Sequence, residues 1–133
     1  DVNFRHALAE DTGFPDGYFD IVTSYILHHE VTEQATYDII QEASRLLRPG
    51  GTYYPVDFYT NPGRKAKDHR AYRRVRDWMT YRWNHERWLW DYQNADFEGE
   101  MRRAGLLVNR NSEGHTDGYG MRRVRNLLGT KPA

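Results

Sequence analysis

The sequence predicts an α/β fold built around one strand–helix–strand unit. A short apolar run from Phe19 to Ser24 lies between turn residues and is typical of a strand buried on both faces. Helical periodicity begins after Thr32, and Thr52 to Phe58 then has the composition of a second strand. We expect these two strands to be parallel and joined by a right-handed crossover, because a helical connection of this length closes in that way.

Capping and periodicity support the helix. Thr32 is a good N-cap residue, and Glu33 places negative charge in the first turn, where the helix dipole favours it. Pro49-Gly50-Gly51 ends the helix. One helical face is apolar and consists of Ile39, Ile40, Ala43, Leu46 and Leu47.

The rest of the chain adds a helix and two strands. Ala95 to Ala104 has the pattern of a helix that ends at Gly105, and 106–108 and 124–128 indicate the last two strands. Pro55 is unusual in the second strand, because proline has no N–H to donate to a neighbouring strand.

Length and composition indicate one domain. A chain of 133 residues supports one core, and its 19 basic and 19 acidic residues give no overall attraction to nucleic acid or membrane. There is no cysteine, which excludes a disulfide framework and a cysteine nucleophile. The sequence has neither a long apolar run nor a signal-peptide pattern, so we expect a soluble, cytoplasmic protein with no membrane partner.

Two motifs resemble those of a known family. Ala9 to Ser24, AEDTGFPDGYFDIVTS, is similar to the middle motif of class I S-adenosylmethionine-dependent methyltransferases, and Leu47 to Thr52, LRPGGT, is similar to their post-strand motif. The resemblance implies a Rossmann-like methyltransferase half with a mostly parallel sheet in the order 4-5-7-6, in which the last strand is antiparallel. Residues 1–133 would then be a single, truncated domain that lacks the glycine-rich cofactor loop.

This resemblance has consequences for activity and partners. It implies S-adenosylmethionine as cofactor and a small molecule as methyl acceptor, and we expect the isolated chain to be inactive or incomplete. The strand at Phe19 to Ser24 would be an exposed sheet edge, which favours a homodimer through that edge. The alternative is a non-enzymatic module that dimerises, or that binds an anion or nucleic acid through residues 64–92.

The cofactor residues are implied by position in the family motifs. Leu8, Ala9 and Glu10 would lie against the adenine, and Ser24 and Tyr25 beside the methionine part. The family often has Asp where this chain has Leu8. Leucine cannot accept a hydrogen bond from the adenine amino group, so Glu10 or a backbone group would have to serve.

The resemblance also implies where the methyl acceptor binds. His28 or His29 would lie near it and could act as general base, since imidazole titrates near neutral pH. Asp57 and Tyr59 end the second strand at the same edge and are further acceptor-binding candidates. Two alternatives stay open: one histidine caps the following helix or packs inside, and positioning alone suffices for methyl transfer. We expect no metal site, because no His-Glu-x-x-His motif occurs.

A basic and aromatic segment, residues 61–93, is predicted to be a helical insertion. Three interpretations stay open for it. It can be a solvated basic face over an aromatic core stripe, or a lid whose Trp78 and Tyr81 shape the acceptor pocket. It can also bind nucleic acid, although acidic residues interrupt the basic patch, and we do not expect that role.

Overall fold

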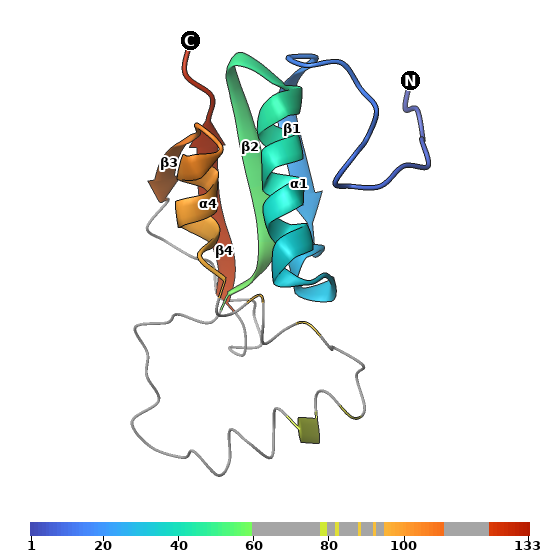
Figure 1. The fold of residues 1–133 in the computed structure, drawn as a ribbon, viewed down its shortest axis with the longest axis vertical. Helices are drawn as coiled ribbons and strands as arrows, with labels where there is room; N and C mark the ends of the chain where they lie inside the picture. The colour runs from blue at the N-terminus through green and yellow to red at the C-terminus, as the bar shows by residue number, and fades with distance from the viewer. Residues whose placement is uncertain (60–77, 80–81, 83–87, 89–91, 93–94, 111–122) are drawn as a thin grey trace.

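The computed structural model describes residues 1–59, 78–79, 82, 88, 92, 95–110 and 123–133 (Figure 1). The predicted insertion at 61–93 therefore falls mostly outside the described residues and stays a prediction. The strands are β1 (Phe19–Tyr25), β2 (Leu47–Tyr59), β3 (Leu107–Arg110) and β4 (Arg123–Thr130). The described helices are α1 (Glu33–Leu46), α4 (Phe97–Arg103) and the short 3-10 turn η1 (His28–Glu30).

The four strands form one sheet in the order β1-β2-β4-β3. β1 and β2 are parallel, and β4 is antiparallel to both β2 and β3. This is the order 4-5-7-6 that the family resemblance implied. As expected, most of the strands run in one direction, and only β4 is reversed. Because β4 lies between β2 and β3, which run opposite to it, the sheet is mixed rather than mostly parallel in its pairings.

Both helices cover the same face of the sheet (Figure 1). The core forms where they meet the sheet, because each element turns one apolar side toward the others. It contains wholly or almost wholly buried side chains from α1, β2, α4 and β4, among them Ile40, Tyr53, Phe97, Met101 and Leu127. In the residues that the structure describes, no helix has the length and apolar character needed to cross a bilayer.

The expectation that the first strand is buried on both faces is wrong. In β1, Ile21 is 67% exposed and Tyr25 is 72% exposed, whereas Ser24 is buried. β1 is an edge strand with β2 as its neighbour in the sheet, and α1 packs over one face only. An apolar run shows only which residues are suited to burial. Whether each of them is buried depends on the elements that pack against the strand.

The predicted start of α1 is confirmed. The Thr32 side chain accepts a hydrogen bond from the backbone N–H of Ala35 at 3.1 Å, which satisfies one of the free donors at the helix start. The helix ends one residue before Leu47, where β2 begins, so this strand starts earlier than the predicted Thr52. Gly50 has φ +79, a backbone conformation that suits glycine at this exit.

Pro55 is accommodated by the pattern of strand pairing. It lies in the interior of β2 opposite Ser24 of β1, and its side chain is fully buried. On the other side of β2, the paired residues step from Tyr53 to Val56, so the ladder with β4 skips the proline. The missing N–H is therefore placed where no strand hydrogen bond is made.

Candidate functional site

The candidate site lies where β1 ends and the chain turns through η1 into α1. This turn is tied to the neighbouring strand, because the N–H of Ile26 donates to the carbonyl of Val56 at 2.8 Å. Ile26 has φ +51, a left-handed conformation that is costly for a β-branched residue. Tyr25 is exposed at this position, and its contact with the cofactor stays a prediction.

Ser24 does not present its hydroxyl to solvent. Its Oγ lies 3.0 Å from Nε2 of His28 and 2.9 Å from the hydroxyl of Tyr53, and that hydroxyl lies 2.9 Å from the same Nε2. All three side chains are buried, and burial is the main reason that the pKa of Tyr53 is raised, an effect that the Ser24 hydrogen bond opposes. The triangle locks the end of β1 to β2.

His28 is thus a buried structural histidine in this geometry. It is 0% exposed, and the edge of its ring meets the ring of Phe97 with the centroids 4.8 Å apart. The alternative that one histidine packs inside describes His28, while its prediction as a general base stays without support from its surroundings.

Asp57 organises the other histidine. Its Oδ2 accepts from the backbone N–H of His28 at 2.7 Å and from that of His29 at 3.3 Å, and its Oδ1 accepts from Nδ1–H of His29 at 2.7 Å. Asp57 is 2% exposed. A single carboxylate from β2 therefore binds the first N–H groups of η1 and holds one imidazole, and its role in acceptor binding stays a prediction.

The second nitrogen of His29 lies near an exposed carboxylate. Nε2 lies 3.2 Å from the Oε1 atom of Glu30, whose side chain is 56% exposed, whereas the His29 side chain is 4% exposed. His29 is thus held between a buried carboxylate and an exposed one.

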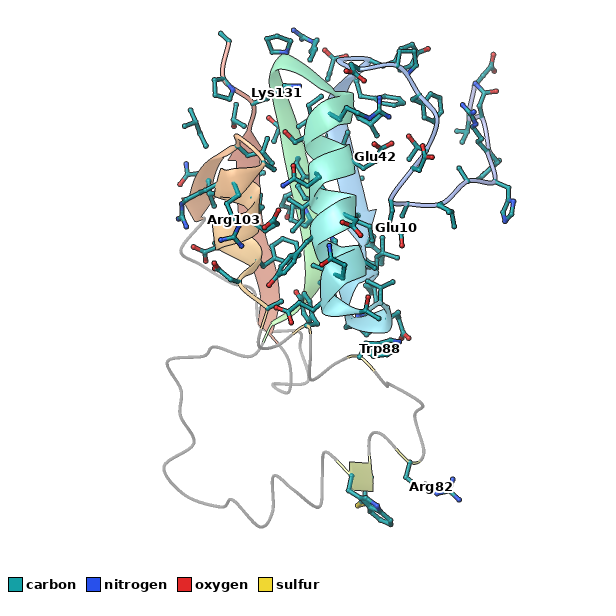
Figure 2. The ribbon with its side chains drawn as sticks, in the orientation of Figure 1. Glu10, Glu42, Arg82, Trp88, Arg103 and Lys131 are labelled. Carbon is teal, nitrogen blue, oxygen red and sulfur yellow. The ribbon has the colours of Figure 1, made fainter. Side chains whose placement is uncertain are left out.

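The residues implied to contact adenine lie on the N-terminal segment beside α1. Leu8 is 70% exposed, and Ala9 and Glu10 are half-buried. Glu10 lines an open hollow along α1, where Figure 2 shows it near Glu42. The other residues around the hollow are Asp38, Gln41, Glu42 and Arg45.

Glu42 anchors this segment to α1. Its Oε1 accepts from the N–H of Thr12 at 2.9 Å and from the Thr12 hydroxyl at 2.7 Å, and its carboxylate also pairs with Arg45 at 2.7 Å. These donors, with Arg45 the largest contributor, hold the pKa of Glu42 at about 2. The contact positions the stretch that carries Ala9 and Glu10.

The remaining predicted site residues are only partly placed. Trp78 is described and is 59% exposed. Tyr59 ends β2, but its side chain is outside the described part of the chain, as is all of Tyr81. Across the residues that are described, no cluster of three or more His, Cys, Asp or Glu side chains could hold a metal ion.

Known proteins share both the sequence and the fold of this region. Residues 1–54 match the family model of the methyltransferase domain. Over 58 residues, 44% of this chain, the sequence is 40% identical to an uncharacterized methyltransferase from Synechocystis sp., of which it covers 27%. Residues 1–54 thus carry the sequence of a class I S-adenosylmethionine-dependent methyltransferase domain. The aligned part of the chain spans about a quarter of the length of this curated relative.

Solved structures share the fold of this chain. The YcgJ protein from Bacillus subtilis matches with a TM-score of 0.65 at 15% identity, over 98% of this chain and 71% of that one. An O-methyltransferase family protein from Burkholderia thailandensis matches with a TM-score of 0.64 at 19% identity, over 98% and 35%. A methyltransferase from Methanosarcina mazei matches with a TM-score of 0.59 at 18% identity, over 93% and 64%. These similarities concern the fold.

The methyltransferase family implies S-adenosylmethionine, and the described residues fit it in part. The carboxylate of Glu10 can accept from an amino group, and the exposed Tyr25 stands at the carboxyl end of a parallel strand, where α/β folds bind ligands. Leu8 can offer only its backbone, and the hydroxyl of Ser24 is engaged inside the protein. If this chain binds S-adenosylmethionine, the contacts available to it are the backbone of Leu8 and the side chains of Glu10 and Tyr25.

Sequence reasoning missed three residues of this site. Tyr53, Glu30 and Glu42 were not predicted as site residues, although each contacts a predicted residue or its segment. Only the pairing of Ser24 with β2 brings Tyr53 to it, and that register is not written in either strand alone.

Proposed function

We propose that this chain carries the acceptor-facing part of an S-adenosylmethionine-dependent methyltransferase that acts on a small molecule. The observation that carries the proposal is the match of residues 1–54 to the methyltransferase domain, together with a turn at the carboxyl ends of β1 and β2. When bound, the cofactor supplies a methyl group on a sulfonium sulfur. Around it, Glu10 and Tyr25 would bind the cofactor.

The protein's own contribution is to orient the acceptor and to remove its proton. Ser24, His28 and Tyr53 hold the end of β1 rigid, so a ligand at this turn meets a fixed surface. His29 would take the acceptor's proton, and Tyr59 with the aromatic residues Trp78 and Tyr81 would line its pocket. Because this chain covers 27% of the curated relative, we also propose that it holds only part of the cofactor site.

The test is calorimetric titration of the 133-residue chain with S-adenosylhomocysteine, at a concentration where its mass is also measured. We expect binding no tighter than about 1 mM, since a partial site makes few contacts. Binding at about 1 μM would contradict the partial site. Binding at about 1 μM together with a mass twice that of the chain would indicate that a second copy completes the site.

A second arm tests the methyltransferase proposal itself. Ultraviolet crosslinking of the chain to methyl-labelled S-adenosylmethionine detects even weak proximity. We expect label on the peptides that contain Glu10 or Tyr25, competed by excess S-adenosylhomocysteine. Label that does not compete, together with salt-dependent binding to a polyanion, would contradict the proposal and favour an anion-binding module.

A further inference from the structure

The two adjacent histidines have different surroundings. His28 is fully buried, and its Nε2 lies within hydrogen-bond distance of both Ser24 and Tyr53. His29 contacts carboxylates through both ring nitrogens, Asp57 at Nδ1 and Glu30 at Nε2. The sequence, which presents the two as equivalent neighbours, does not distinguish them.

The chemistry of Asp57 sets the tautomer of His29. An ionised carboxylate is acceptor-only, so Oδ1 at 2.7 Å requires the proton of the neutral ring to be on Nδ1. The same carboxylate receives two backbone N–H groups of η1, which prevents it from turning away. In the neutral ring, the lone pair is then on Nε2, the nitrogen that lies 3.2 Å from the Glu30 carboxylate.

We propose that Asp57 is a positioning residue that makes His29, rather than His28, the proton-accepting histidine of this turn, with Glu30 as its link to solvent. The catalytic use of this arrangement rests on the proposed function. The acceptor would be a group that loses a proton on methylation, such as a hydroxyl, a carboxylic acid or a protonated amine.

The proton balance is simple. The acceptor's heteroatom releases its proton to the lone pair on Nε2 of His29 while Nδ1 keeps its own proton, so the ring becomes an imidazolium. Asp57 on one side and Glu30 on the other stabilise that cation, because both are carboxylates within 3.2 Å or less of a ring nitrogen. The Nε2 proton then passes to Glu30 and to water. The exposed Glu30 side chain has to rotate aside for an acceptor to reach Nε2.

The first test locates the proton by long-range proton–nitrogen NMR of the 133-residue chain, at a pH well above the ordinary titration range of imidazole. We expect Nδ1–H for His29 in the unchanged chain. In Asp57→Asn, whose amide can donate to Nδ1, the proton should move to Nε2. Ser24→Ala is the matched control, because it removes a partner of His28 and should leave the His29 signals unchanged. An Nε2–H tautomer in the unchanged chain would overturn the proposal. This observation is made without any substitution, so it does not depend on whether the variants fold.

The second test asks which histidine is reachable from solvent. An unprotonated imidazole nitrogen attacks diethyl pyrocarbonate and becomes ethoxycarbonylated, and fragment ions in mass spectrometry separate His28 from His29. We expect modification of His29 to rise severalfold in Glu30→Ala and to stay unchanged in Glu33→Ala, a carboxylate that contacts Tyr37 instead. Modification of His28 at an equal rate would overturn the proposal.

Neither readout needs cofactor or acceptor. Failure of the chain to crosslink to S-adenosylmethionine would therefore count against the proposed function alone. A wrong tautomer, or equal reactivity of the two histidines, would count against the role of Asp57 alone.

Discussion

Replacement of Glu42 by glutamine tests how the N-terminal motif is held against α1. The change keeps the side chain's shape and removes its charge. A native pKa of about 2, against an ordinary value of 4.5, corresponds to about 3 kcal/mol of stabilisation of the charged form. Arg45 is 34% exposed in its side chain, so solvent screening reduces this, and we expect a loss of about 1–2 kcal/mol at pH 7.

The effect should depend on pH in a defined direction. Because folding lowers the pKa of Glu42, its stabilisation is present above pH 4.5 and is lost as the pH falls from there toward about 2. The unchanged chain and Glu42→Gln should therefore differ most at neutral pH and converge in acid.

Urea unfolding monitored by tryptophan fluorescence at pH 7 and at pH values between 4.5 and 2 measures the difference. Asp38→Asn is the matched control on the same helix, since the Asp38 carboxylate accepts from the exposed Gln34 side chain, and its effect should stay within about 0.5 kcal/mol. A Glu42→Gln effect that is the same at every pH would refute the reasoning, because it would show that shape rather than charge is responsible.

Three further substitutions test local features of the fold by urea unfolding. Lys131→Met removes an ammonium that donates to two carbonyls at the end of α1, at 2.9 and 2.8 Å, and should cost about 1–2 kcal/mol; Figure 2 places Lys131 at that end. Tyr53→Phe deprives Ser24 and His28 of a buried hydroxyl and should cost about 1–3 kcal/mol, whereas no loss would mean that the triangle is not formed. Gly51→Ala places a Cβ 2.9 Å from a backbone carbonyl oxygen and should cost about 1–3 kcal/mol, and an unchanged midpoint would contradict that close approach.

Local signals in the sequence were sufficient for the strand–helix–strand unit. Thr32 caps its helix as predicted, since an N-cap depends only on the next three residues. The motifs around Ala9 to Ser24 and Leu47 to Thr52 also led correctly to the methyltransferase family and, through it, to the strand order. The dimer through the edge of β1 stays a prediction.

The site could be predicted only in outline. Its place at the carboxyl end of the first strand follows from chain order, because parallel strands end at the same edge of a sheet. The direction of each side chain does not, and Ser24 turned inward although its position suggested a ligand contact.

By itself the sequence determined the methyltransferase-domain motifs and the order of the described strands and helices, because these depend on motifs and periodicities within short stretches. Only the tertiary structure decided that Ile21 and Tyr25 are exposed, that Tyr53 meets Ser24, and that Asp57 selects one of two adjacent histidines. The physical reason is that burial and hydrogen bonding between distant residues depend on strand register and on which face a helix covers. Neither quantity is contained in any single stretch of this chain.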